Sequence, residues 1–262
     1  MDTRRQVVLL IIVLVAAALG SAVAHAQVDQ SALAAQIRRA NAKERSRALE
    51  QVRLLGPEST GPELRAALIA ALEQEGQLRG RRYHADLRGE RLEPLEDPEF
   101  VFRLSRVVAA LRDPQAIPAL TGALGSGAPV RRALVAFGEE AVPALVAAVG
   151  SPESIEYVVD DALIALRLMV EGAGPQPLSA GALTEVRRVA KLRLTGKQYF
   201  TTLWDAIDLA VALDDPELTQ IVRSLASDRD AVIARGIEDP ELIQETQRLA
   251  AERLAGVPAW RP

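Results

Sequence analysis

Cysteine is absent from the 262-residue chain. Its absence excludes disulfides, thiolate metal sites, a cysteine nucleophile and the lipid-modified cysteine of a bacterial lipoprotein. Histidine is almost as scarce, because only His84 remains beyond the N-terminal leader described below. One histidine cannot build a histidine-rich metal site; it could in principle serve a Ser/His/Asp arrangement, but no nucleophile elbow accompanies it. We therefore predict a protein that is not an enzyme, with no catalytic residues, no metal and no cofactor.

Aromatic residues make up only 3% of the chain, although 49% of its residues are hydrophobic. Sheets favour β-branched and aromatic side chains, whereas a core of alanine, leucine and valine is typical of packed helices. An excess of one charge is also lacking, since 31 basic and 35 acidic side chains give a net charge of −4. No global field exists to hold nucleic acid or an anionic membrane. The composition predicts an all-α protein that binds neither.

The N-terminus has the three regions of a secretory signal peptide. Arg4 and Arg5 precede an apolar run over residues 7–19, and small residues lead to Ala24-His25-Ala26. This order is typical of a leader that is cleaved after an A-x-A site. We expect cleavage before Gln27 and a periplasmic or secreted protein. An uncleaved membrane anchor remains an alternative, because residues 7–24 are nearly long enough to span a bilayer.

The rest of the chain carries repeated helix punctuation. An Asp or Ser that can cap free amides, followed by a proline suited to the first turn, predicts a helix start. Such starts occur at Asp97-Pro98, Asp113-Pro114, Ser151-Pro152, Asp215-Pro216 and Asp239-Pro240, and a capping box is expected at Thr60 to Glu63. Glycines just beyond the apolar stripes predict helix stops. These are Gly56, Gly76, Gly125, Gly138, Gly150, Gly172, Gly196 and Gly256.

One helix sequence recurs after 25 residues. AIPAL at 116–120, followed by Leu124-Gly125, returns as AVPAL at 141–145, followed by Val149-Gly150. Self-similarity at a fixed period is the signature of stacked repeats. This stretch resembles bacterial HEAT repeats, including the HEAT-like repeats named for phycobiliprotein lyases, which have similar A-I-P-A-L and V-R-x-A-L helices. The resemblance implies a right-handed α-solenoid of antiparallel helix pairs with divergent terminal helices.

The punctuation divides the chain into six segments. After the leader at 1–26, we expect an N-terminal helical pair over 27–78 and an exposed charged loop over 79–96. A HEAT-like core follows over 97–172, then a Gly/Pro linker over 173–181 and a divergent helical region over 182–262.

Charge and aromatic residues are unevenly distributed. Residues 36–53 carry six basic and two acidic side chains, whereas residues 198–250 carry four basic and eleven acidic ones. Solvated helix faces explain most such runs, but they can also guide docking or self-association. Tyr199, Phe200 and Trp204 are concentrated in one short segment. We expect them in the core, with an exposed binding hot spot as the alternative.

A stacked helical array leaves a long face free, so we predict a non-catalytic scaffold or adaptor that binds another protein. Two alternatives stay open: a lyase-like or ligand-handling protein, and a membrane-anchored structural component of the envelope. The partner and the oligomeric state are not predictable from the sequence.

The predicted partner-binding residues lie on the second helices of the two best repeats. HEAT arrays place their second helices on the concave face, so the resemblance implies that polar residues of these helices lie side by side there. The candidates are Arg131, Arg132, Glu156, Tyr157, Asp160 and Asp161. The alternative is that Arg131 or Arg132 pairs with Asp160 or Asp161 in an exposed ladder, which would contribute at most about 1 kcal/mol.

Overall fold

The computed structural model describes residues 29–39 and 41–256, and every regular element in these residues is helical. The predicted all-α class is confirmed for this part of the chain, while the expected leader at 1–26 lies outside it. The helices are α2 (Gln30–Arg39), α3 (Ala42–Leu55), α4 (Pro62–Leu87), α5 (Phe100–Ala110), α6 (Ile117–Gly122), α7 (Ala128–Phe137), α8 (Val142–Gly150), α9 (Glu156–Val170), α10 (Ala180–Thr195), α11 (Phe200–Ala212), α12 (Pro216–Ser227), α13 (Arg229–Ile233) and α14 (Pro240–Leu254). Short 3₁₀ turns are η1 (Pro57–Ser59), η2 (Pro114–Ala116) and η3 (Gly138–Ala141).

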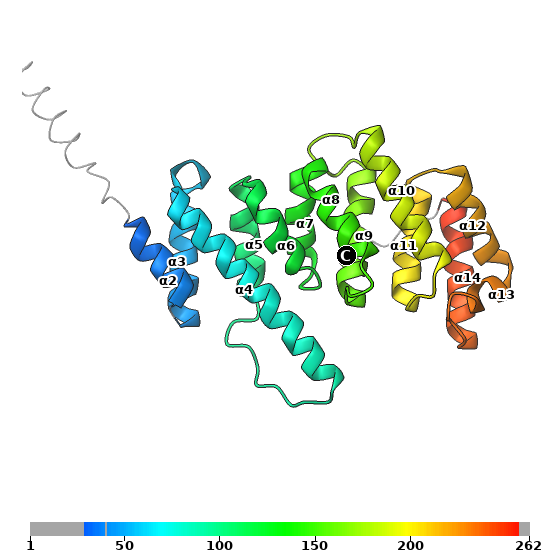
Figure 1. The fold of residues 1–262 in the computed structure, drawn as a ribbon, viewed down its shortest axis with the longest axis horizontal. Helices are drawn as coiled ribbons and strands as arrows, with labels where there is room; N and C mark the ends of the chain where they lie inside the picture. Colours follow the sequence, from blue (N-terminus) through cyan, green and yellow to red (C-terminus); the bar gives the residue numbers. More distant parts are fainter. Residues whose placement is uncertain (1–28, 40, 257–262) are drawn as a thin grey trace, which may run out of the picture.

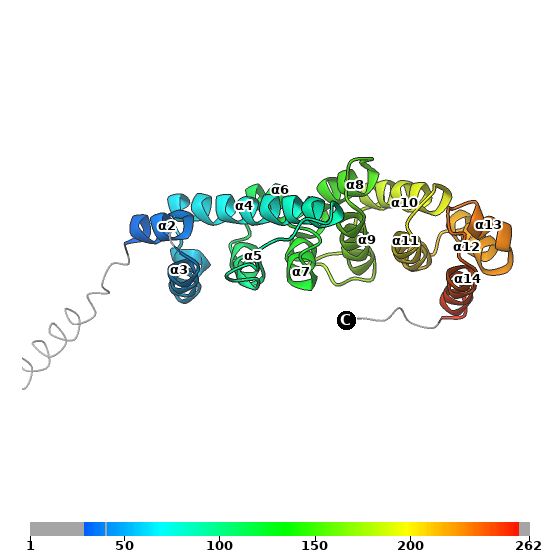
Figure 2. The same cartoon turned by 90° about the horizontal axis from the view of Figure 1, so that it is seen from below.

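The helices lie side by side in two rows along an elongated molecule (Figures 1 and 2). The first row contains α2, α4, α6, α8, α10 and α12, and each helix contacts the next one in the row. The second row contains α3, α5, α7, α9, α11 and α14, which are in contact in the same order. Each first-row helix also packs on its second-row partner, as α8 does on α9. The apolar stripes therefore face one continuous core between the rows.

The repeated helix sequence has the same burial pattern in both copies. Ile117 and Leu120 of α6 are buried, as are Val142 and Leu145 of α8. The prolines that follow Ile117 and Val142 lie exposed in the first helical turn, where a missing amide hydrogen breaks no helical bond. The repeat is therefore a packing unit that places the same aliphatic side chains in the core.

Several predicted helix starts are confirmed at their caps. The Asp215 carboxylate accepts hydrogen bonds from the amides of residues 217 and 218, and Asp239 accepts from those of residues 241 and 242. Asp113 caps the 3₁₀ turn before α6. In contrast, the helices expected at Asp97 and Ser151 begin at Phe100 and Glu156.

The predicted capping box at the start of α4 is wrong. Gly61 is the N-terminal cap residue, and the Thr60 hydroxyl donates instead to the carbonyl of Gly56, 2.7 Å away. The Glu63 carboxylate accepts from Ser31 of α2 at 2.8 Å. Both side chains of the expected box are thus engaged in other contacts, which tie α4 to its neighbours.

Two further predictions are wrong at the long helix α4. Gly76 does not end the helix but lies buried inside it, where an added Cβ would approach the carbonyl oxygen of Gly122 in α6 to 2.5 Å. Residues 79–87, expected to be a loop, continue α4 to Leu87, because Arg79 covers the Phe102 ring and Tyr83 packs on Tyr157. The chain then leads back to α5 through residues 88–99, which form no regular helix (Figure 1).

The N-terminal segment 27–78 also differs from the expected pair. It contains the pair α2 and α3 together with most of α4, which pairs with α5. The apolar residues Leu33, Ile37, Leu49 and Val52 of α2 and α3 are buried, so this pair packs into the core.

One stretch in the described residues, Ala128–Gly150, is long and apolar enough to cross a membrane. It comprises α7, η3 and α8, because the α-helix ends at Gly138, whose φ is 62°. About half of this apolar window, 56%, is buried inside the molecule. Its composition is accounted for by two short helices that pack in the core.

Candidate functional site

Two of the predicted partner-binding residues form a buried ion pair. Arg131 Nη1 of α7 contacts Asp161 Oδ1 of α9, and their side chains are only 13% and 8% exposed. Asp161 Oδ2 also accepts from the amide of Gly125, 2.7 Å away. The pairing that the sequence offered as an alternative is present, but it is enclosed rather than exposed. It joins α7, α9 and the turn after α6, and offers little surface to a partner.

Asp160 faces the next helix of the second row. Its carboxylate accepts from the hydroxyls of Thr201, at 2.7 Å, and Thr202. Burial raises the pKa of Asp160, while the two hydroxyls act in the opposite direction. Asp205, one turn further along α11, has a pKa of about 8, because burial and then the negative charges of Asp160 and Asp208 disfavour its ionised form. At the contact between α9 and α11, the carboxylates of Asp160 and Asp205 therefore lie close enough for the charge of Asp160 to raise the pKa of Asp205.

Glu156 and Tyr157 meet a residue from far away in the sequence. The rings of Tyr157 and Tyr83 pack edge-on with their centroids 4.5 Å apart, and the Tyr83 hydroxyl donates to Glu156 Oε2 at 3.2 Å. Burial raises the pKa of Tyr83, and the negative charge of Glu156 acts in the same direction. Tyr199 lines the same cavity as Glu156. We call Tyr83, Tyr157, Tyr199 and Glu156 the tyrosine cluster. It gathers all three tyrosines of the chain.

The tyrosine cluster is partly open to solvent. Tyr199 is 55% exposed, Glu156 is exposed, and Tyr83 and Tyr157 are half-buried. The other aromatic residues of its segment face inward, since Phe200 is half-buried and Trp204 donates to the Thr246 hydroxyl at 2.9 Å. The expected core position is therefore wrong for Tyr199, whereas Phe200 and Trp204 are half-buried, and Phe200 packs against the core. Arg132, the remaining predicted site residue, is exposed on α7.

Sequence reasoning did not include Tyr83 because it placed that residue in a loop. His84, next to it, is exposed and lies at the end of α4 rather than in that loop. The scarcity of tyrosine was the only available signal. A helix that extends far enough to reach α9 is needed before Tyr83 and Tyr157 can meet.

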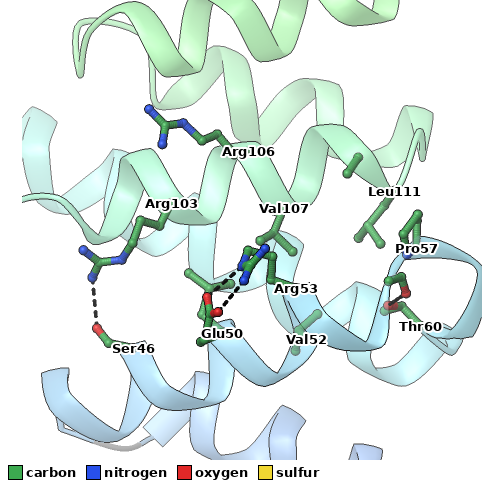
Figure 3. A pocket seen from close by; sticks show the side chains of 13 residues that line it. Ser46, Glu50, Val52, Arg53, Pro57, Thr60, Arg103, Arg106, Val107 and Leu111 are labelled. Atoms are coloured by element: carbon green, nitrogen blue, oxygen red, sulfur yellow. Dashed lines mark hydrogen bonds and ion pairs between the residues drawn. The ribbon is translucent and has the colours of Figure 1, made fainter.

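A second surface feature, an apolar groove, lies between α3 and α5 (Figure 3). Here the second row packs less closely than between α5 and α7. The space measures about 350 Å³, and its floor is formed by Leu49, Val52, Val107 and Leu111. We call this space the α3–α5 groove. The sequence shows the positive charge of residues 36–53 but not the groove, which depends on the spacing of α3 and α5.

Three arginines and one glutamate line the α3–α5 groove. Arg53 forms a two-pronged pair with Glu50, including an Nε–Oε2 distance of 2.8 Å. Arg103 donates to the Ser46 hydroxyl at 3.0 Å (Figure 3). It also pairs with Asp97. Arg106 is exposed and has no ion-pair partner in the described part of the chain. Arg106 therefore carries the unpaired positive charge among the described residues that line the groove.

Neither surface has the residues of a metal centre. Within residues 29–39 and 41–256, no group of three or more His, Asp or Glu side chains could hold a metal ion. Comparisons with protein-family models, curated proteins and solved structures found no match to the chain. Function must be inferred from the two surfaces themselves.

Proposed function

We propose that the protein is an exported, non-catalytic scaffold that binds another protein through the exposed face of a HEAT-like α-solenoid. The two-row packing and the repeated helix sequence support a solenoid of antiparallel pairs, and the resemblance supports its HEAT-like class. Such arrays bury each repeat against its neighbours and keep one long face for binding.

The tyrosine cluster is the observation that carries this proposal. Exposed tyrosines are enriched among the residues that dominate binding energy at interfaces. Here Tyr83 and Tyr157 hold each other in place, so little side-chain freedom is lost when a partner covers them. Glu156 adds a polar group that can orient the partner, and the exposed Arg132 lies on the neighbouring helix of the same row.

Partner capture from the cell-envelope fraction tests this role. The immobilised mature chain is compared with a triple variant, Tyr83→Ala, Glu156→Gln and Tyr199→Ala. We expect the same specific protein to be recovered with the wild type and to be lost with the variant, at unchanged helicity. The matched control changes Glu185→Gln and Leu192→Ala, two exposed residues of α10 in the first row. Equal recovery with the triple variant would contradict the assignment.

Export is tested separately by the intact mass of the protein recovered from the envelope. The leader pattern predicts a chain that begins at Gln27. A chain that retains residues 1–26 and sediments with membranes would support the anchored structural component instead.

A further inference from the structure

We infer that the α3–α5 groove is a binding site for a small amphipathic anion, with an apolar body and a carboxylate or similar head group. This site lies apart from the tyrosine cluster, between different helices of the second row. The inference does not depend on the proposed scaffold role.

The size and lining of the groove fit an apolar body. Small-molecule sites typically measure about 300–1,000 Å³ and are mostly apolar, and this groove measures about 350 Å³. Leu49 and Val52 of α3 face it from one side and Val107 and Leu111 of α5 from the other. A protein interface would need roughly 800 Å² on each partner, which a space confined between two helices does not offer.

The rim supplies the complement to a negative head group. Arg53 uses only its Nε and Nη2 on Glu50, which leaves Nη1 available. Arg106 has no ion-pair partner in the described residues, and Figure 3 shows its head directed away from α3, so it reaches a head group only by turning toward the groove. A guanidinium can bind a carboxylate through two parallel hydrogen bonds, which strengthens and orients the contact. In Figure 3 the Arg53 head lies between α3 and α5 beside Val107, so a carboxylate can reach it while an apolar chain lies on the floor.

A second copy of the chain is a poorer occupant. The acidic C-terminal region is complementary in charge, but its apolar residues Leu218, Val222, Leu225 and Ile243 are buried in its own core. Of the described large apolar side chains beyond Asp205 only Ile233 is exposed, so this region offers charge with little apolar surface to fill the groove. Sedimentation of the purified chain tests this directly, and self-association that Arg106→Glu abolishes would overturn the small-anion assignment.

Three probes that carry a similar unbranched apolar chain and different head groups separate the contributions. Decanoate, decanol and decyltrimethylammonium are titrated calorimetrically into the purified mature chain, below the concentrations at which they form micelles. We expect decanoate to bind at one site, at least about tenfold more tightly than the cationic probe, because the groove is lined by three arginines and a single glutamate. Equal affinities of the three probes, or no binding of decanoate, would refute the inference.

Variants then locate the binding. Ala110→Tyr places a ring at the exposed lip of the groove and should abolish decanoate binding, while Arg106→Gln should weaken it by about tenfold. Arg47→Gln is the matched control, since Arg47 is exposed on α3 but does not line the groove. Circular dichroism melts confirm that each variant is folded. Decanoate affinity that is unchanged by Ala110→Tyr would place any binding elsewhere and overturn the site.

Discussion

Replacing Asp205 by asparagine should make the protein less sensitive to rising pH. Burial and the nearby charges of Asp160 and Asp208 raise the pKa of Asp205 from 3.8 to about 8, although Arg167 and Arg131 oppose the shift. The folded state therefore binds the Asp205 proton more tightly than the unfolded state does. Stability due to this group is greatest below about pH 4, falls as the pH rises, and levels off above about pH 8.

The size of the effect follows from the width of this pH window. Over this window the folded state holds the proton and the unfolded state does not. Each pH unit within it lowers the free energy of unfolding by about 1.4 kcal/mol. Between pH 4.5 and 7 the wild type should lose about 3 kcal/mol of unfolding free energy relative to Asp205→Asn. Asparagine is neutral at every pH and resembles the protonated acid in shape, so the variant should lack this loss.

Urea unfolding at pH 4.5, 6 and 7 measures this difference, with circular dichroism as the probe. Asp86→Asn is the control, because it removes an exposed carboxylate from the end of α4. The control should follow the pH dependence of the wild type. The difference in unfolding free energy between the wild type and Asp205→Asn should change by about 3 kcal/mol from pH 4.5 to pH 7. A change of less than about 1 kcal/mol would refute the burial of a protonated carboxyl at this position.

The remaining predictions concern packing around the buried ion pair. Gly125→Ala should lower the free energy of unfolding by more than about 2 kcal/mol, because its φ is 82° and an added Cβ would overlap the Tyr157 ring. Gly80→Ala, inside α4, meets open space and should raise the free energy of unfolding by about 0.5–1 kcal/mol. Arg131→Ala should cost about 3 kcal/mol by leaving a buried carboxylate without its cation, while the exposed Arg132→Ala should change stability by less than about 0.5 kcal/mol. Thermal and urea unfolding check both comparisons, and similar costs within either pair would contradict the reasoning.

Local signals in the sequence were sufficient for the helical class and for several helix boundaries. At Asp215 and Asp239 the cap, the proline and the following acid all act within one turn, so no distant contact is needed. The extent of α4 could not be predicted in this way. Residues 79–87 lack an apolar stripe, and their helix is supported by contacts of Arg79 and Tyr83 with residues of α5 and α9. Tertiary packing outweighs local propensity at such positions.

The two candidate surfaces illustrate the same limit in different ways. That Arg131 and Asp161 lie on adjacent helices was predictable from the repeat, but how deeply they are buried depends on how α7 and α9 turn toward each other. The α3–α5 groove depends on a spacing between helices that are not joined by a short turn. The chain between α3 and α5 runs through the whole of α4 and residues 88–99, so local signals in the sequence do not fix the spacing of these two helices (Figure 1). At the tyrosine cluster the missing information was the extension of α4, because only the longer helix brings Tyr83 to Tyr157 of α9.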